Sequence, residues 1–294
     1  MQAARAVAPT AAERPPRGTR LRAVSLDLDD TLWPVAPDIA AAERELDAWL
    51  RQHHAEVARR WPIDALRRLR EAVALERPDL AHDFTAQRLL TLERAFDACG
   101  CGKEHVETAY EVYFAARNGV QCYPDALPAL AAIAARLPLA SISNGNADLA
   151  RIGLRAHFRH CLSARECGVA KPAAAIFQQA CVRLGVPPAD VLHVGDDPLL
   201  DVIGARLAGL RTAWLNRAGA DWSACIATPR VREAVAALGR DADALAPPDV
   251  EVGDLGELAR WIERHLDAPD EAWPTRPAAI AGAFPAGSSD RMLQ

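Results

Sequence analysis

The sequence predicts an α/β fold in which a doubly wound, Rossmann-like parallel sheet carries an inserted subdomain of α-helices. Two observations support this fold class. In the second half of the chain, short apolar segments alternate with helical patterns, which is typical of a parallel sheet covered on both faces. Near the N-terminus, a long stretch of purely helical pattern follows the first apolar segment directly.

The first predicted strand covers residues 21–28, which are mostly apolar and are followed by turn-forming residues. A short apolar segment without polar alternation is expected to be buried on both faces of a sheet. The same pattern recurs at residues 137–143, 191–194 and 212–215, with Val250 and Val252 as a last edge strand. Helical patterns separate or follow these strands at residues 147–158, 173–184, 199–208 and 255–266.

The segment between the first two strands contains only helical patterns. Asp38 is expected to cap its first helix, and further helices are predicted over residues 63–75, 84–99 and 103–117. An insertion of this length is far longer than an ordinary connection. We therefore expect residues 37–120 to form a helical subdomain over a core built from residues 21–36 and 121–266.

Three segments lie outside this scheme. Residues 1–20 and 267–294 are rich in Ala and Pro and are expected to be disordered extensions. The four arginines and single acid of residues 1–20 also fit an organellar transit peptide, and this alternative stays open. Residues 216–247 mix Gly, Pro and polar residues around one helical stretch near 231–238, which predicts a surface excursion.

Composition argues against several classes of protein. The 34 basic and 39 acidic side chains give a net charge of -5, which does not favour a nucleic-acid binder. No apolar stretch is long enough to span a bilayer, so a membrane protein is not expected. The seven scattered cysteines suit a reducing compartment, and we expect a cytoplasmic protein, either a monomer or a homodimer.

Polar residues gather where the predicted strands end. They are Asp27, Asp29 and Thr31 after the first strand, Ser143 and Asn144 after the second, and Asp196, Asp197 and Asp201 after the third. Lys171 opens the helix between the second and third of these strands. Because open parallel sheets bind ligands at the carboxyl ends of their strands, these residues are expected to share one site.

The chemistry of these residues predicts both a metal and a phosphate. A cluster of carboxylates is tolerated when a divalent cation binds to it, and hard oxygen ligands such as Asp27 and Asp196 favour Mg²⁺. Ser143, the backbone amide of Asn144 and Lys171 are donors that suit the oxygens of a phosphoryl group. The expected ligand is a small-molecule phosphate ester.

The spacing of Asp27 and Asp29 predicts a division of labour between them. Residues two apart in an extended chain project to the same side, so both carboxylates can reach one ligand. Asp27 could attack phosphorus to form an aspartyl-phosphate. Asp29 could protonate the leaving alkoxide and then deprotonate the attacking water.

Four motifs resemble, in chain order, those of the haloacid dehalogenase superfamily of phosphohydrolases. They are DLDDT at 27–31, SNGN at 143–146, GVAKP at 168–172 and VGDDPLLD at 194–201. The resemblance covers residues 21–266 and implies that the helical insertion is the cap of such an enzyme. Family members that break carbon–halogen bonds lack the second acid, so the resemblance implies that a chain with Asp29 is a phosphatase.

The resemblance also implies a role for each motif residue. Asp27 would be the nucleophile, Asp29 the general acid and base, and Asp196 a carboxylate ligand of Mg²⁺, with the backbone carbonyl of residue 29 as a further ligand. Ser143 and Lys171 would hold the phosphoryl group. Asp197 and Asp201 would orient metal-bound water and Lys171. Thr31 would stabilise the loop.

A narrower resemblance extends into the predicted cap. LRRLREAVALERPDLAHDFTAQR, together with SISNGNA and VLHVGDDPLLDVIGA, is similar to bacterial phosphatases that act on FMN and on 5-amino-6-(5-phospho-D-ribitylamino)uracil, an intermediate of riboflavin synthesis. Substrates overlap within this group. Phosphoglycolate, sugar phosphates and pyridoxal phosphate are therefore alternative substrates.

Three residues are candidates for recognising the rest of the substrate. Trp33 could stack on a flat ring or pack against the cap. His82 could contact the leaving group, or together with Asp83 it could cap the helix that runs from Thr85. Arg88 could meet a phosphate or a ring carbonyl, although most helix arginines are solvated.

A phosphoryl-accepting signalling receiver is the competing interpretation from another class. Receivers also combine acidic residues, a hydroxyl, a lysine and Mg²⁺, but they hold a phosphoryl group instead of releasing it. They are smaller, have no helical cap, and lack a proton shuttle placed like Asp29. The sequence therefore favours the phosphatase.

Overall fold

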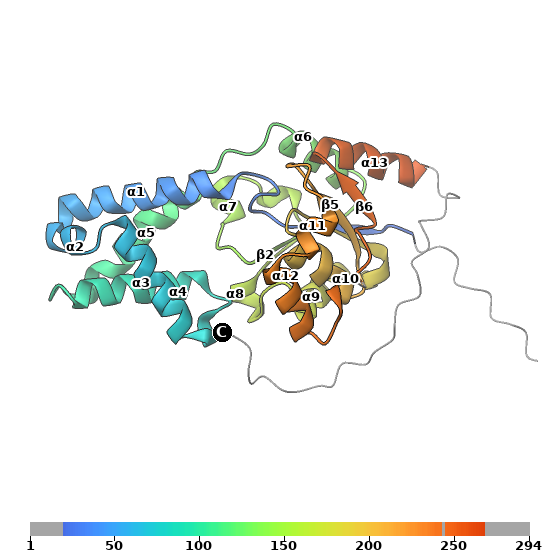
Figure 1. The fold of residues 1–294 in the computed structure, drawn as a ribbon. Helices are drawn as coiled ribbons and strands as arrows, with labels where there is room; N and C mark the ends of the chain where they lie inside the picture. The colour runs from blue at the N-terminus through green and yellow to red at the C-terminus, as the bar shows by residue number, and fades with distance from the viewer. Residues whose placement is uncertain (1–19, 243–244, 268–294) are drawn as a thin grey trace, which may run out of the picture.

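The computed structural model describes residues 20–242 and 245–267. Its centre is a six-stranded parallel sheet in the order β3-β2-β1-β4-β5-β6 (Figure 1). The strands are β1 (Ala23–Leu26), β2 (Leu139–Ser143), β3 (His160–Ser163), β4 (Val191–Gly195), β5 (Arg211–Leu215) and β6 (Val250–Val252). The predicted doubly wound parallel sheet is confirmed.

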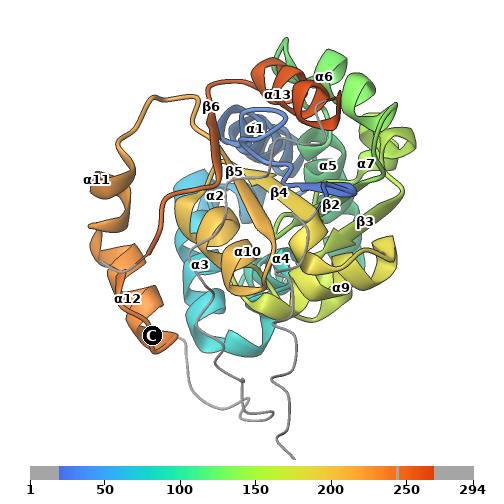
Figure 2. The same ribbon diagram turned by 90° about the vertical axis from the view of Figure 1, so that its right-hand side faces the viewer.

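The central strand β1 has apolar residues on both faces, because helices cover both faces of the sheet. Val24 and Leu26 belong to one core cluster, whereas Ala23 belongs to another on the opposite face. Helices α6 (Ala126–Ala134) and α13 (Leu255–Asp267) cover the first face, and α9 (Ala174–Leu184) and α10 (Gly204–Leu207) cover the second (Figure 2). Successive strand residues point to opposite faces, so both must be apolar.

Strand β3 is an element that sequence analysis missed. The helical pattern predicted over residues 147–158 ends early, as α7 (Leu149–Ile152) and a 3₁₀ turn (Arg155–His157). Gly153 has a φ of 86°, a left-handed conformation that stops α7. The chain then turns back to the sheet edge, where Ala140 and Ser143 of β2 pair with the ends of β3.

A separate helical layer lies beside the carboxyl ends of the strands (Figure 1). It consists of α1 (Val35–His53), α2 (Ala55–Arg60), α3 (Ile63–Glu76), α4 (Phe84–Asp97) and α5 (Val106–Arg117). These helices share a core of their own, which includes Leu46, Leu50 and Phe96. We refer to α1–α5 as the cap.

The start of the cap differs from the prediction. Helix α1 begins at Val35, after Pro34 in an extended conformation, so Asp38 lies in the first turn and does not cap the helix. Asp30 takes the capping role instead, because its Oδ1 accepts a hydrogen bond of 2.9 Å from the Val35 amide. Asp30 also has a φ of 58°, which aspartate tolerates better than most residues and which turns the chain sharply after β1.

The predicted excursion after β5 lies at the surface and contains the expected helical stretch. A π-helical segment (Pro198–Ile203) follows β4, and α11 (Trp222–Ile226) and α12 (Pro229–Ala237) pack near it. Val231 and Val235 share an apolar cluster with Leu199 and Ile203. Helices α11 and α12 therefore form a small third packing layer over the segment that follows β4.

The two predicted terminal extensions fall, apart from Arg20 and Asp267, outside the described residues. Within residues 20–242 and 245–267, no helix is long and apolar enough to cross a membrane.

Candidate active site

A cavity of about 290 Å³ lies between the carboxyl ends of the strands and the cap. It brings together most of the residues that the sequence singled out: Asp27, Asp29, Ser143, Asn144, Lys171, Asp196 and Asp197 from the core, and Arg88 from the cap. Thr31 and Asp201 do not line the cavity, but both contact residues that do.

Lys171 lies at the centre of the site. Its Nζ is 2.6 Å from Asp27 Oδ1 and 2.6 Å from Asp201 Oδ1, and the residue is only 3% exposed. Burial lowers the pKa of Lys171, but the two carboxylates outweigh burial and raise it above its usual range. The side chain is therefore a permanent buried cation that compensates two carboxylates.

Asp201 uses both of its carboxylate oxygens inside the protein. Oδ1 accepts from Lys171 and lies 3.2 Å from His193 Nε2, while Oδ2 accepts from the Asp197 amide at 3.0 Å. Burial raises the pKa of Asp201, but Lys171 and His193 outweigh it and hold that pKa at about 2. Asp201 is therefore an ionised anchor for Lys171, in keeping with the role that the resemblance implies.

His193 supports this anchor from beneath. Its Nδ1 is 2.9 Å from Ser25 Oγ, and burial lowers the pKa of the imidazole, so the ring is neutral at pH 7. A carboxylate can only accept, so Nε2 carries the proton and donates to Asp201, and Nδ1 accepts from Ser25. His193 is thus a hydrogen-bonded core residue of β4.

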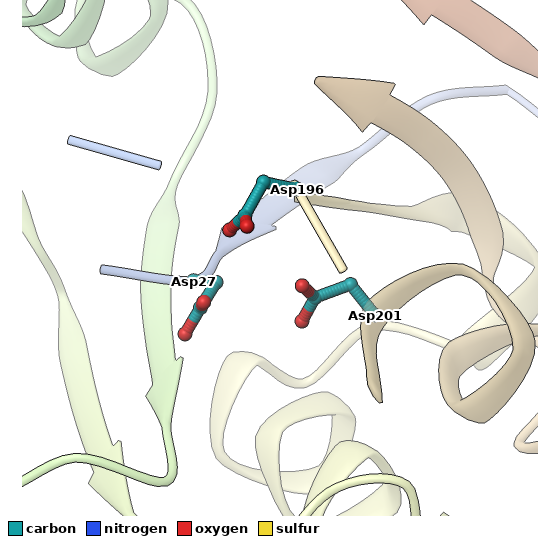
Figure 3. A group of neighbouring side chains, drawn as sticks. All are labelled: Asp27, Asp196 and Asp201. Carbon is teal, nitrogen blue, oxygen red and sulfur yellow. The ribbon is translucent and has the colours of Figure 1, made fainter. Parts of the chain in front are cut away.

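Asp27 and Asp196 are the carboxylates that still have an oxygen available to a ligand. Oxygens of Asp27, Asp196 and Asp201 lie within 4.8 Å of one another, and Figure 3 shows the three carboxylates converging. Burial, followed by repulsion from Asp201, raises the pKa of Asp196 to about 7. Burial also raises the pKa of Asp27 well above its usual value, although Lys171 opposes the shift.

This arrangement fits a divalent cation between Asp27 and Asp196. Two carboxylates whose charged forms are disfavoured by burial would be stabilised by a hard cation with oxygen preference. Asp196 is steadied for this by Thr31, whose Oγ1 donates to its Oδ1 at 3.1 Å. Asp201 is not a candidate ligand, because its oxygens already accept from Lys171, His193 and the Asp197 amide.

Asp197 lines the cavity and also contacts the segment after β4. Its Oδ1 accepts from the amides of Leu199 and Leu200, at 2.8 and 2.9 Å, and its Oδ2 pairs with Arg230. The carboxylate therefore caps the π-helical segment after β4, and the rigidity of that turn positions Asp201 behind Lys171.

Asp29 is held from the cap side by two donors. Its Oδ1 accepts from Trp33 Nε1 at 2.9 Å and from Arg117 Nη2 at the end of α5. Its Oδ2 lies so close to Gly145 that a Cβ at residue 145 would come within 2.4 Å of it. Glycine is therefore needed at this position for the loop after β2 to approach Asp29.

The structure does not support a stacking role for Trp33. The side chain is fully buried, and its indole nitrogen is committed to Asp29. A buried indole needs a hydrogen-bond partner, and the carboxylate four residues earlier provides it. Trp33 thus helps to position Asp29 and offers no face to a ligand.

The loop after β2 holds the backbone of Lys171 and also positions the hydroxyl donor of Ser143. The Asn144 side chain accepts from the Lys171 amide at 2.8 Å and donates to the Lys171 carbonyl at 3.0 Å. Ser143 Oγ accepts from the Gly145 amide at 3.0 Å, which leaves its hydroxyl proton available to another acceptor. The two polar loops are therefore fixed to each other at the cavity wall.

The other two candidates for substrate recognition, Arg88 and His82, line different cavities. Arg88 lines the same cavity as Asp27, whereas His82 lines an adjoining cavity of about 500 Å³. Asp83, not His82, caps α4, because its Oδ1 accepts from the Ala86 amide at 2.9 Å. His82 is therefore not in the cavity that contains Asp27 and Asp29, although Ser143 and Asn144 line both cavities.

Sequence reasoning missed five cavity residues of the cap: Ile39, Arg70, Phe84, Tyr113 and Arg117. Each belongs to a predicted helix, where an arginine is ordinarily solvated and a phenylalanine is ordinarily core. Arg117 carried one weak signal, because it is the last residue of the last cap helix, where the chain returns to the sheet. Its guanidinium is 2% exposed and faces Asp29.

Comparison with known proteins identifies the family. Residues 21–209 match the family model of the haloacid dehalogenase-like hydrolases. The chain belongs to this family. It is 33% identical over 206 residues to the 5-amino-6-(5-phospho-D-ribitylamino)uracil phosphatase YigB of Escherichia coli, which covers 69% of this chain and 86% of that protein.

Two further members of the family widen the comparison. A phosphoserine phosphatase of Thermus thermophilus is 35% identical over 170 residues, which is 56% of this chain and 60% of that enzyme. The crystal structure of a 2-haloacid dehalogenase from Pseudomonas syringae superposes with a TM-score of 0.72 at 32% identity, covering 83% of this chain and 99% of the other. Family membership thus establishes a hydrolase-type fold but leaves two chemistries to distinguish.

Replacing Lys171 by Met should strongly destabilise the protein. The change leaves the buried carboxylates of Asp27 and Asp201 without their shared cation, and breaking such a pair costs about 3–5 kcal/mol. Urea unfolding at pH 7 measures the loss. The matched control is Lys103→Met, whose ammonium pairs with Glu93 on the surface, 56% exposed, and should cost less than about 1 kcal/mol. Equal losses for the two variants would show that Lys171 does not support the site in this way.

Proposed function

We propose that the protein is a Mg²⁺-dependent phosphomonoesterase that works through an aspartyl-phosphate. The observation that carries this proposal is the grouping of Asp27, Lys171 and Asp196 at the strand ends, with a second acid, Asp29, on the same wall of the cavity. Phosphatase relatives support it, because two of the similar proteins carry that name.

The residues divide the reaction as follows. A carboxylate oxygen of Asp27 attacks phosphorus while the bond from phosphorus to the ester oxygen breaks, and Asp29 gives its proton to the leaving oxygen. Water then attacks the aspartyl-phosphate, Asp29 takes a proton from that water, and the bond between phosphorus and Asp27 breaks. Lys171 and Ser143 hold the phosphoryl oxygens throughout.

Mg²⁺ bound by Asp27 and Asp196 would supply the positive charge that a phosphoryl group needs beside two carboxylates. Lys171 cannot supply this charge alone, because Asp201 already shares it at 2.6 Å. The chain therefore provides the ligands and the rigid frame, and the cation provides the remaining compensation.

For the substrate we propose the phosphoribitylamino-uracil of riboflavin synthesis, FMN, or both. The support is the similarity to the YigB phosphatase over 86% of that protein's length and 69% of this chain. Phosphoglycolate, sugar phosphates and pyridoxal phosphate are the alternatives within the same chemistry. The cavity continues into a second one of about 500 Å³, so a leaving group larger than glycolate has room.

Dehalogenation is the second candidate, because a dehalogenase shares this fold with a TM-score of 0.72. An alkyl halide needs a nucleophile but no proton for its leaving group, so it gives no role to Asp29. Chloride release from 2-chloropropionate should be undetectable under conditions where an aryl phosphate turns over. Turnover of the halide at a comparable rate would favour the dehalogenase.

Replacing Asp27 by Asn should reduce kcat for p-nitrophenyl phosphate by on the order of 10³-fold or more, because the amide cannot attack phosphorus. Initial rates with saturating Mg²⁺ measure the change. The control Asp64→Asn alters an aspartate of the cap surface whose side chain is 78% exposed, and it should retain the parent rate. Parent-like turnover by Asp27→Asn would rule out the aspartyl-phosphate.

Replacing Asp29 by Asn should cost more activity on poor leaving groups than on good ones. Removing a general acid typically costs on the order of 10²- to 10⁴-fold where the leaving group needs a proton. The loss in kcat should therefore be large for β-glycerol phosphate and much smaller for p-nitrophenyl phosphate. Equal losses on the two substrates would assign Asp29 to positioning instead of proton transfer.

The pKa of Asp196 gives a stability test of the metal site. In the metal-free protein this pKa is about 7, against an ordinary value of 3.8, so the folded state holds a proton that the unfolded state has lost. The contribution of Asp196 to stability therefore falls as the pH rises from about 4 through 7. Asp196→Asn removes this penalty and should stabilise the metal-free protein at pH 8, with little effect at pH 4.

Mg²⁺ should reverse the order of stability, so that the parent becomes more stable than Asp196→Asn. At pH 8 the cation should raise the melting temperature of the parent more than that of Asp196→Asn, because the variant lacks one ligand. Scanning calorimetry with Mg²⁺ or with EDTA gives both comparisons. Two results together would contradict this assignment: Asp196→Asn loses the same stability at pH 4 and at pH 8, and Mg²⁺ raises its melting temperature as much as that of the parent.

A further inference from the structure

The cap wall of the catalytic cavity carries two arginines that no carboxylate neutralises. Arg70 of α3 and Arg88 of α4 both line the cavity that contains Asp27. Across residues 20–242 and 245–267, neither guanidinium makes a salt bridge, whereas Lys171 and Arg117 in the same cavity each do. The cap thus presents unpaired positive charge opposite the acidic strand ends.

Arg88 is held in place by an aromatic side chain and not by an acid. The residue is 6% exposed, its Nη2 donates to the Tyr113 hydroxyl at 2.9 Å, and its guanidinium carbon lies 3.9 Å from the centre of the Tyr113 ring. Burial, and to a smaller extent the charge of Arg70, lowers the pKa of Arg88, and the opposing effects of Tyr113 and Glu43 do not fully offset this shift. A buried guanidinium in this state favours an additional acceptor.

Arg70 adds a second unsatisfied donor. Its Nε is buried and has no hydrogen-bond partner in the structure. Buried polar groups are ordinarily hydrogen-bonded, so an orphaned donor on a side chain that lines the cavity calls for a partner, which a bound ligand would provide.

Phe84 supplies an apolar surface next to these donors. It is the first residue of α4, it is 41% exposed, and it borders the catalytic cavity. It also borders the adjoining cavity of about 500 Å³ and a third one of about 340 Å³. An exposed phenyl ring where three cavities meet is suited to contact the face of a second ring.

We propose that Phe84, Arg70 and Arg88 form the subsite for the leaving group, and that this subsite takes a planar ring with carbonyl oxygens on its edge. The ring stacks on Phe84, and the carbonyl oxygens accept from the two guanidinium groups. Phe84 thereby has the stacking role that the sequence suggested for Trp33. The inference rests on the proposed function, since it places the phosphoryl end of the same substrate at Asp27.

A carboxylate could satisfy the arginines, but it would leave Phe84 without a role. This difference allows a test with four phosphate esters that separate the two features. FMN has a ring with carbonyls, phenyl phosphate a ring alone, O-phosphoserine a carboxylate alone, and β-glycerol phosphate neither. The measured quantity is kcat/KM for the parent, Arg88→Met, Phe84→Ala and the control Arg68→Met, an exposed arginine of α3.

Arg88→Met should lower kcat/KM for FMN by on the order of 10-fold or more, and should leave phenyl phosphate and β-glycerol phosphate within about twofold of the parent. Phe84→Ala should lower the values for FMN and phenyl phosphate by about threefold to tenfold and spare the two esters without a ring. Arg68→Met should match the parent on all four.

Two outcomes would overturn the proposal. If Arg88→Met lowered the value for O-phosphoserine alone, the arginines would bind a carboxylate. If it lowered all four values equally, Arg88 would serve the phosphoryl group or the fold. Melting temperatures check folding, and Arg88→Lys, Arg70→Met and Phe84→Leu provide the same comparison where the larger changes unfold the cap.

Binding of riboflavin, the ring without its phosphate, separates this proposal from the proposed function. Quenching of riboflavin fluorescence by the parent, weakened at least about tenfold by Arg88→Met, would support the subsite even if no ester were hydrolysed. Turnover of the esters without riboflavin binding and without the predicted selectivity would leave the phosphatase standing and overturn the subsite.

Discussion

The ammonium group of Lys171 is the constraint on which the site depends. It lies 2.6 Å from a carboxylate oxygen of Asp27, at the end of β1, and 2.6 Å from one of Asp201, in the segment after β4. The Asn144 side chain, after β2, holds the backbone of the same lysine in both directions. Three neighbouring strand ends are thereby fixed around one buried charge, which neither carboxylate could leave without an uncompensated desolvation cost.

A second set of contacts connects the cap to Asp29, the acid for which we propose proton transfer. Arg117, the last residue of α5, donates to Asp29, and the next residue, Asn118, accepts from the Asp148 amide in the loop after β2 at 2.7 Å. The chain that returns from the cap therefore contacts both catalytic loops. A shift of the cap about this return would change the surroundings of Asp29 directly, so the proton transfer that we propose for Asp29 would depend on the position of the cap.

The sequence predicted the core side of the site well, because strand ends in a parallel sheet meet at one edge whatever the details of packing. Asp27 and Asp196 needed only that rule to be brought together, and Lys171 joins them from the loop before α9. The cap side could not be predicted in the same way. Whether Trp33 or Phe84 faces a ligand depends on how the cap helices lie against the sheet, and the helical period alone does not give that orientation. Strand β3 was missed because a single glycine, not a change of hydrophobic pattern, ends the helix before it.

Both walls of the cavity carry charge that the protein does not fully compensate, negative on the sheet side and positive on the cap side, and this constrains the ligand. On the sheet side, Asp27 and Asp196 have raised pKa values because burial leaves their negative charge undercompensated. On the cap side, Arg70 and Arg88 lack carboxylate partners among the described residues. One ion pair, Arg117 with Asp29, connects the two walls, but in the part of the chain that the structure describes it leaves Asp27, Asp196, Arg70 and Arg88 without a partner across the cavity. The ligand that we propose would satisfy both walls, because a phosphate ester of an oxygen-bearing ring would meet a cation at one end and the arginines at the other.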